Sequence, residues 1–317
     1  MANNKKPKFS IVIPVYNVEE YLGKCLDSVV NQTYNNYEAI IVCDKSLDNS
    51  EKIVDEYVNK YSNFKKIYKE NTGLSTARNL GVDACAGEYI LFLDGDDYYQ
   101  KDLLEKLNKE VKNNIDLIRF QVQNIYNNAI IPYEEKGFDI TSGINVFNTI
   151  INYHYVENAW AYCYNAKFFK RNNFHFKKNA IAEDFGLIPL IIANAKNVKS
   201  LSYIGYNYVQ RDNSLMNNND YSKRIKKMND MIDQANVLKQ ELKNIKDNET
   251  ILLFINNSLI YYSTTLKYFD YLKYHKLLKQ IKCFDYLPKN TIKKRLKSFL
   301  IKNCTYFYYH FIVRFYG

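Results

Sequence analysis

The sequence is poor in the residues and patterns that define several protein classes. Its 317 residues include only 10 Gly and 5 Pro, which excludes collagen-like repeats and Gly/Pro-rich linker architectures. The six cysteines are scattered without a C-x-x-C pair, which indicates reduced cytosolic thiols and argues against a disulfide framework or a structural zinc site. The four His residues also lack metal-ligand spacing.

Targeting signals and long apolar runs are missing as well. The polar N-terminus leads directly into a strand-like segment, so no signal peptide is expected. The longest apolar stretches are interrupted by Asn and Ser, so no transmembrane span is expected. We therefore predict a cytoplasmic protein.

Positive charge is concentrated at one end of the chain. The net charge is +10, yet residues 1–220 hold 25 basic against 27 acidic residues. Residues 267–317 hold 12 Lys or Arg against two Asp. No nucleic-acid-binding motif accompanies this charge, so nucleic acid is not an expected partner.

Strand and helix patterns alternate over the first hundred residues. Buried strands are predicted over 9–14, 39–43 and 88–93, with amphipathic helices between and after them. Three β-α repeats predict an α/β fold with a mainly parallel sheet flanked by helices. The spacing of Asn17 and Glu20 also predicts a capping box at the start of the first helix.

Three regions follow from these patterns. We predict one half of a catalytic domain over residues 1–105, a second half over 106–216, and a helical, basic and aromatic extension over 217–317. The last boundary lies at the polar stretch Asn217–Asn219, after which the pattern is helical.

Carboxylates follow the third predicted strand. Ligands of parallel α/β sheets bind at the carboxyl ends of strands, which directs attention to 14–17, 44–50 and 94–97. Asp94, Asp96 and Asp97 offer the oxygen ligands that Mg²⁺ or Mn²⁺ prefers. The alternative is a solvated acidic turn.

Other polar residues have both a functional and a structural interpretation. Asp44 is either a site residue or a turn and cap residue. Arg78 suits pyrophosphate oxygens but could equally be a surface Arg. Glu183 and Asp184 begin a predicted helix, where acidic residues are also favoured as simple helix caps.

Several segments together resemble glycosyltransferase family 2, in its bacterial branch that builds capsules, teichoic acids and other surface glycans. The resemblance covers about residues 8–215, and its ordered segments are 10–17, 41–50, 71–79, 92–97, 159–160, 167–169, 183–185 and 208–214. Any one motif would be weak, but the ordered set is specific. Cys43 and Lys45 depart from the pattern, which usually has Asp or Asn and then Gly there, and Lys tolerates a left-handed backbone poorly.

The resemblance implies a glycosyltransferase A fold (Rossmann-like), a UDP-sugar donor and Mn²⁺ or Mg²⁺. By position it assigns the nucleotide-sugar site to Pro14, Tyr16, Asp44, Asn71, Arg78 and Asp94. It assigns the metal to Asp96 with Asp94, and an acceptor or phosphate contact to Arg211 and Ser214. Asp184 is the implied catalytic base, supported by Glu183.

The chemistry agrees with these roles. A sugar hydroxyl needs a carboxylate to accept its proton, and the departing UDP needs positive charge. We therefore predict an inverting, metal-dependent glycosyltransferase of the hexosyltransferase type, acting on a glycan or lipid-linked acceptor. The rival hypothesis is a non-catalytic nucleotide- or glycan-binding module on the same fold.

The basic, aromatic segment 267–317 has two interpretations of its own. Such a composition suits the interface of an anionic membrane, which would make the chain peripheral on the inner face of the cell membrane. Alternatively, the aromatic residues pack within a helical cap and the lysines are solvated. A third hypothesis makes this segment the main binding element of a membrane or nucleic-acid adaptor.

Overall fold

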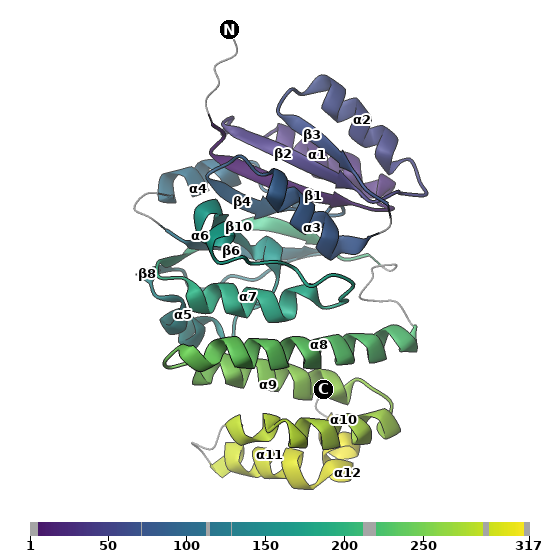
Figure 1. Cartoon of the computed structure of the whole chain (residues 1–317), viewed down its shortest axis with the longest axis vertical. Coiled ribbons are helices and arrows are strands. Elements are labelled where there is room, and N and C mark those ends of the chain that lie inside the picture. The colour runs from purple at the N-terminus through teal and green to yellow at the C-terminus, as the bar shows by residue number, and fades with distance from the viewer. Residues whose placement is uncertain are drawn as a thin grey trace. The chain divides into compact units, whose positions relative to one another are not determined.

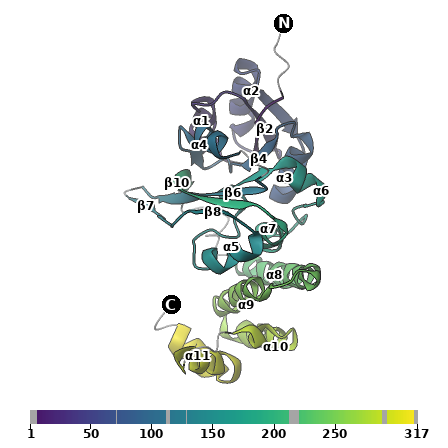
Figure 2. The ribbon, with the colours of Figure 1, turned by 90° about the vertical axis from the view of Figure 1, so that its left-hand side faces the viewer.

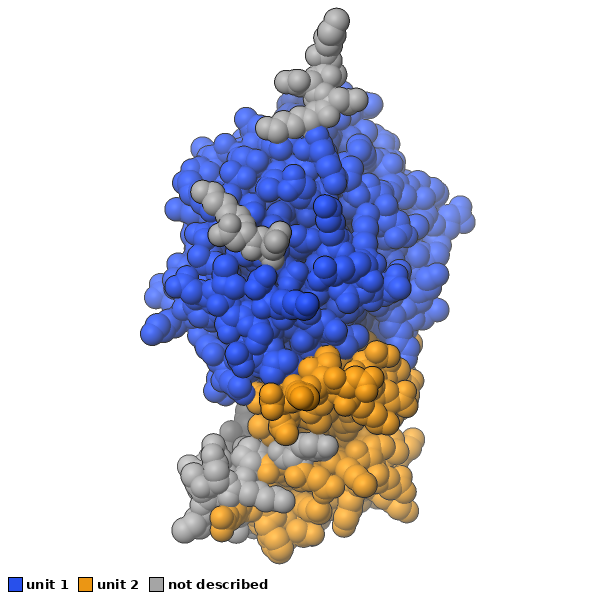
Figure 3. Space-filling view, turned by 60° about the vertical axis from the view of Figure 1, so that its left-hand side comes forward, with its two compact units in different colours: residues 1–218 blue, residues 219–317 orange. Residues whose placement is uncertain are grey.

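The computed structural model describes residues 6–70, 72–111, 115–127, 129–211, 220–287 and 292–313. The chain forms two compact units, residues 1–218 and 219–317 (Figure 3).

One mixed sheet of ten strands forms the centre of the first unit (Figure 1). Its main path has the order β3-β2-β1-β4-β9-β6-β10-β5, with β7 paired to β6 and β8 paired to β10. The strands are β1 (Phe9–Val15), β2 (Tyr37–Cys43), β3 (Phe64–Tyr68), β4 (Tyr89–Phe92), β5 (Tyr98–Tyr99), β6 (Leu117–Ile125), β7 (Ile130–Pro132), β8 (Phe138–Thr141), β9 (Tyr162–Asn165) and β10 (Val198–Val209).

The first half of the sheet is parallel. Strands β3, β2, β1 and β4 pair in parallel, and every residue of β1 and β2 is buried. Their connections are α1 (Glu19–Val30), α2 (Ser50–Lys60) and α3 (Gly73–Ala84). Helix α3 packs closely on the sheet, because a Cβ at Gly81 would lie 2.2 Å from Cγ1 of Val12. The predicted α/β fold with flanking helices is confirmed.

The second half of the sheet is mixed and contains strands that the sequence patterns did not predict, among them β5, β7, β8 and β9. Strand β9 lies antiparallel between β4 and β6. Helices α5 (Gly143–Ile150) and α7 (Glu183–Asn194) lie together on one side of β6, β8 and β10 (Figure 2). The remaining helices of this unit are α4 (Leu103–Glu110), α6 (Ala166–Arg171) and the 3₁₀ turn η1 (Ala159–Ala161).

The predicted capping box at the start of α1 is wrong. Val18 is the N-cap residue and makes no side-chain cap, and the N–H of Glu19 donates instead to Oδ2 of Asp48 at 3.0 Å. Asn17 adopts a φ of 50°, and its Oδ1 accepts a hydrogen bond from the backbone N–H of Leu47 at 2.7 Å. Its side chain therefore joins the loops after β1 and β2 instead of capping α1.

The second unit is helical. Its helices are α8 (Tyr221–Glu241), α9 (Glu249–Thr264), α10 (Tyr268–Gln280), α11 (Ile292–Asn303) and α12 (Thr305–Phe307), with 3₁₀ turns η2 (Leu242–Asn244) and η3 (Cys283–Tyr286) and a π-helical turn η4 (Tyr308–Val313). The periodicity of Ile225, Met228, Ile232, Ala235 and Leu238 predicts one face of this helix, and all of them except the half-buried Ile225 are buried in α8. Among the described residues, no helix combines the length and apolar character needed to cross a bilayer.

Candidate active site

Polar residues follow three neighbouring parallel strands at the same edge of the sheet. Tyr16 follows β1, Asp44 follows β2, and Asp94 comes two residues after β4. Pro14 is buried in β1, whereas Tyr16 is 47% exposed. Within the acidic turn, a Cβ at Gly95 would approach the Pro14 carbonyl oxygen to 3.1 Å, so a small residue lets the turn lie against the end of β1.

Asp44 is anchored by its own chain. Its Oδ1 accepts the N–H of Thr72 at 2.9 Å and lies 2.7 Å from Nζ of Lys69, while its Oδ2 accepts the N–H of Gly73 at 2.8 Å. Lys69 is also buried and donates to Oγ1 of Thr72 at 2.6 Å. Burial opposes ionisation, but Lys69 and the two backbone groups outweigh it and lower the pKa of Asp44.

The loop after Asp44 keeps a left-handed conformation without glycine. Lys45 has a φ of 53°, in the region that usually favours Gly or Asn. Its Nζ lies 3.7 Å from a carboxylate oxygen of Glu70, and both side chains are exposed. Lys45 departs from the family pattern, but its backbone therefore still adopts the left-handed conformation that glycine favours.

Arg78 joins two distant acidic segments. It lies in α3, is 1% exposed, and its Nη2 donates to Oδ1 of Asp94 at 2.9 Å. Its Nη1 donates to Oε1 of Glu183 at 2.7 Å and to Oδ1 of Asp184 at 3.0 Å. The guanidinium group also lies 5.4 Å from the ring centroid of Phe176. One buried cation thus connects the acidic turn after β4 to the first turn of α7.

Asp184 is held at both carboxylate oxygens. Besides the bond from Arg78, its Oδ2 accepts the N–H of Ala159 at 3.0 Å. The next residue, Trp160, begins a ring stack, since it lies 4.5 Å from Tyr206 and 5.4 Å from Tyr208 between centroids. The segment Ala159–Trp160 therefore links Asp184 to strand β10: Ala159 bonds the carboxylate, and Trp160 stacks on Tyr206 of that strand.

The other two carboxyl groups of the acidic turn have different partners. Asp96 forms an ion pair with Arg211. Asp97 is buried, and it accepts the hydroxyl of Tyr206 at 2.6 Å and the N–H of Val209 at 2.8 Å. Asp97 therefore ties the turn to the end of β10, which brings Arg211 to the acidic turn.

Burial raises the pKa values of these carboxyl groups. Burial, followed by the charge of Asp184, raises the pKa of Glu183 to about 7. Burial also raises the pKa of Asp184, although Arg78 opposes the shift. Burial and the charge of Asp94 raise the pKa of Asp96. In each case the shift favours the uncharged form of the carboxyl group.

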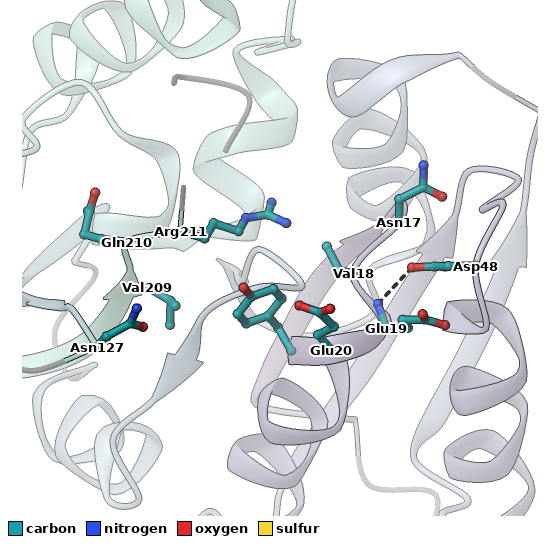
Figure 4. A pocket seen from close by; sticks show the side chains of 10 residues that line it. Asn17, Val18, Glu19, Glu20, Asp48, Asn127, Val209, Gln210 and Arg211 are labelled. Carbon is teal, nitrogen blue, oxygen red and sulfur yellow. Dashed lines mark hydrogen bonds between the residues drawn. The ribbon is translucent and has the colours of Figure 1, made fainter. Parts of the chain in front are cut away.

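A cavity of about 410 Å³ lies beside Arg211, the ion-pair partner of Asp96 (Figure 4). One wall comes from the loops after β1 and β2, and the other from the segments after β6 and β10. Its lining residues are Asn17, Val18, Glu19, Glu20, Tyr21, Asp48, Asn127, Val209, Gln210 and Arg211. The Arg211 guanidinium lies 5.4 Å from the Tyr21 ring centroid, so this arginine belongs both to the cavity and to the acidic turn.

The donor set fits a divalent cation that is shared with a diphosphate. Within the described residues, no group of three Asp, Glu, His or Cys side chains could hold a metal ion alone. Mg²⁺ and Mn²⁺ commonly bind one or two carboxylates together with substrate phosphate oxygens, so three protein ligands are not required. Four carboxyl groups pair with two guanidinium groups here: Asp94, Glu183 and Asp184 with Arg78, and Asp96 with Arg211.

The structure brings most of the predicted site residues to one edge of the sheet. Asp44, Arg78, Asp94, Asp96, Glu183, Asp184 and Arg211 lie in the segments described above, with Pro14 and Tyr16 at the end of β1. Asn71 and Ser214 lie outside the described residues. The patterns missed Lys69, which follows β3 and could have been found by applying the strand-end rule to that strand as well. They also missed Tyr206 and its bond to Asp97.

The family follows from comparison with known proteins. Residues 10–181, more than half of the chain, match the family described as Glycosyl transferase family 2. The chain belongs to this family. The uncharacterized glycosyltransferase EpsJ of Bacillus subtilis is 31% identical over 66% of this chain and 63% of its own length. The minor teichoic acid biosynthesis protein GgaB of the same organism is 32% identical over 64% of this chain and 23% of its own length.

Solved structures support the same fold. The S. aureus TarS fragment 1–349 in complex with UDP-GlcNAc aligns with a TM-score of 0.62 and 20% identity, covering 95% of this chain and 91% of that fragment. At this identity the likeness concerns the fold. It agrees with the expected glycosyltransferase A fold with a helical C-terminal region.

Proposed function

We propose that this chain is an inverting glycosyltransferase. It moves a sugar from a UDP-sugar to a hydroxyl of a glycan or lipid-linked acceptor in bacterial surface polysaccharide synthesis. The observation that carries the proposal is Arg78, which bonds Asp94 and Asp184 at once. Family membership, the pathway named for GgaB and the UDP-GlcNAc bound by TarS support the choice of reaction and donor.

Asp184 is the proposed base. An acceptor hydroxyl is a weak nucleophile, so a carboxylate takes its proton while the oxygen attacks the anomeric carbon. Arg78 and the N–H of Ala159 fix the two oxygens of Asp184, and each oxygen retains a second lone pair for the hydroxyl. As the new C–O bond forms, the bond to the UDP oxygen breaks. A single displacement of this kind inverts the anomeric centre.

Glu183 supports the base indirectly. Its Oε1 shares Nη1 of Arg78 with Asp184, so it limits how far that guanidinium can rotate. Its raised pKa also means that it is partly protonated near neutral pH, which reduces the repulsion on Asp184. In this proposal Glu183 positions the base and does not react.

Asp94 and Asp96 would hold a Mn²⁺ or Mg²⁺ ion together with the donor diphosphate. When bound, such an ion supplies positive charge that stabilises the departing UDP. Arg211 is the neighbouring cation, and we propose that it exchanges Asp96 for a donor phosphate oxygen when the donor binds. Arg78 keeps Asp94 in place during this exchange.

In this proposal the nucleobase of the donor binds beside Pro14, Tyr16 and Asp44. Tyr16 is exposed at the end of β1 and offers a ring against which a base can stack. Asp44 reaches uracil by exchanging one of its present donors for the base N–H. Asn71 and Ser214 remain predicted contacts of the donor and acceptor sides.

The direct test is UDP release from a panel of UDP-sugars, with and without Mn²⁺, alongside calorimetry with UDP. We expect metal-dependent UDP binding and slow donor hydrolysis for at least one sugar. Metal-dependent binding with no hydrolysis of any donor, and no transfer to a lipid extract, would favour the rival non-catalytic module. No binding of UDP at all would contradict the proposed donor.

We also place the chain at the inner face of the cell membrane. A lipid-linked acceptor resides there, and residues 267–317 carry the excess positive charge. Much of the basic run 293–302 lies outside the residues whose side chains are described, so the structural argument comes from helix α10.

A further inference from the structure

Helix α10 is anchored to its unit by one face. Tyr271, Tyr274, His275 and Leu278 are buried. The Tyr271 ring stacks 4.8 Å from Tyr309, and Nε2 of His275 lies 2.7 Å from the carbonyl oxygen of Ile301. The orientation of α10 within the helical unit is therefore fixed, and its opposite face is defined.

That opposite face combines apolar and basic side chains. Phe269 is 84% exposed, Leu272 is 36% exposed, and Lys273, Lys276 and Lys279 are also exposed. Phe269 is three residues from Leu272 and four from Lys273, and Lys276 is four residues from Leu272 and three from both Lys273 and Lys279, which places all five on one face of the helix. We call these five residues the α10 stripe.

The apolar end of the α10 stripe continues onto neighbouring aromatic rings. Phe269 lies 6.1 Å from the ring centroid of Tyr268, which in turn lies 5.8 Å from that of Tyr306. Tyr306 is 61% exposed. Aromatic and aliphatic side chains thus gather at the N-terminal end of α10, and lysines occupy the rest of the stripe.

Negative charge is absent from the α10 stripe. The single acidic residue of α10 is Asp270, which lies off the stripe and accepts a hydrogen bond from the Tyr221 hydroxyl at 2.6 Å. The stripe lysines therefore have no acid from their own helix beside them.

We propose that the α10 stripe docks on an anionic lipid bilayer, with Phe269 and Leu272 in the headgroup–acyl boundary and the three lysines over lipid phosphates. This deepens the proposed function, because it brings the chain to a lipid-linked acceptor. The charge pattern selects this occupant. A second copy of the chain would oppose lysines with lysines, and two apolar side chains are far too few for a stable dimer core. A bilayer takes up both the aromatic end and the basic stripe.

The test is vesicle co-sedimentation of the full chain, using phosphatidylcholine vesicles with and without phosphatidylglycerol. Each lysine near an anionic surface contributes roughly fivefold in affinity, so Lys273→Glu/Lys276→Glu/Lys279→Glu is expected to weaken binding on the order of 100-fold or more. The matched control changes three exposed lysines elsewhere in the same unit, Lys223→Glu/Lys243→Glu/Lys246→Glu. It alters the net charge equally and is expected to lose roughly tenfold or less.

A second pair of variants tests the apolar end. Phe269→Ser/Leu272→Ser is expected to weaken binding, whereas Val237→Ser/Tyr261→Ser, which removes exposed apolar side chains from α8 and α9, is expected to leave it unchanged. The proposal is overturned if the two triple lysine variants lose vesicle binding equally, or if the unmodified chain binds vesicles with and without phosphatidylglycerol equally well. It is also overturned if the chain forms a dimer that Phe269→Ser dissociates. Donor hydrolysis by the stripe variants is measured in parallel. If the unmodified chain hydrolyses no donor, the proposed reaction is refuted, and the vesicle-binding result still stands.

Discussion

The Nη1 atom of Arg78 lies 3.0 Å from Oδ1 of Asp184, although 106 residues separate them in the sequence. The second terminal nitrogen of the same guanidinium bonds Asp94 at 2.9 Å. A buried arginine therefore sets the distance between the proposed base and the acidic turn that we expect to face the donor diphosphate.

Substitutions at Arg78 separate charge from geometry. Arg78→Ala leaves the buried Glu183 and the partly buried Asp94 and Asp184 without their cation and is expected to lower the free energy of unfolding by about 3–5 kcal/mol. Arg78→Lys keeps the charge but not the planar fork, so it should fold and lose roughly 100-fold in kcat with a smaller change in KM. Thermal unfolding and initial rates measure the two effects. An Arg78→Lys enzyme with unchanged kcat would show that this geometry is not needed.

The raised pKa of Glu183 predicts how stability depends on pH. Its folded-state pKa of about 7 exceeds the ordinary value of 4.5, so the native state binds more protons than the unfolded state between these values. The free energy of unfolding should therefore fall as pH rises from about 4.5 to about 7 in metal-free buffer. Glu183→Gln removes this group, and denaturant titrations should show a shallower decline. An identical pH slope in both proteins would mean that Glu183 is not the titrating group.

Lys69 is predicted to stabilise the loop that carries Asp44. Lys69→Met leaves Asp44 with backbone donors alone and should lower the free energy of unfolding by about 3 kcal/mol and raise KM for the donor. Lys109→Met, which breaks an exposed pair with Glu105, serves as the matched control and should change little. Equal effects of both substitutions on stability would contradict the role of Lys69.

Asp96 is predicted to make nucleotide binding depend on metal. In calorimetry, Asp96→Asn should lose most of the gain in UDP affinity that Mn²⁺ gives. Its fold should stay intact, because the amide oxygen can still accept a hydrogen bond from the Arg211 guanidinium that now pairs with Asp96. Asp83→Asn removes an exposed carboxylate from α3 and should behave like the unmodified chain. Retention of the full Mn²⁺ effect in Asp96→Asn would remove this residue from the proposed metal site.

The parallel half of the fold and its strand-end residues could be predicted because their physics is local. Alternating buried strands and helices place Tyr16, Asp44 and Asp94 at the same edge of the sheet, and this placement does not depend on how residues after Gln100 fold. The capping-box prediction failed because Asn17 adopts a left-handed φ and bonds Leu47 across the site. Spacing along the chain cannot reveal such a competing long-range partner.

The partners of Arg78 could not be predicted, because they depend on how the second half of the sheet is assembled. Strand β9 inserts antiparallel between β4 and β6, and Ala159, just before it, bonds Asp184. The four-residue pattern of β9 is too short to distinguish from a loop. The family resemblance assigned Arg78 to the donor site and Asp184 to the base, but their direct bond is a finding of the structure.

The most direct measurement is the rate of UDP release by Asp184→Asn, compared with its affinity for UDP in the presence of Mn²⁺. We predict a loss of roughly 10²- to 10⁴-fold in kcat, because the acceptor hydroxyl loses its base. We also predict nearly unchanged UDP binding and a folded protein, because the amide oxygen can still accept the bond from Arg78, although the bond from the N–H of Ala159 is lost. An Asp184→Asn enzyme that transfers sugar at the full rate would contradict the central claim.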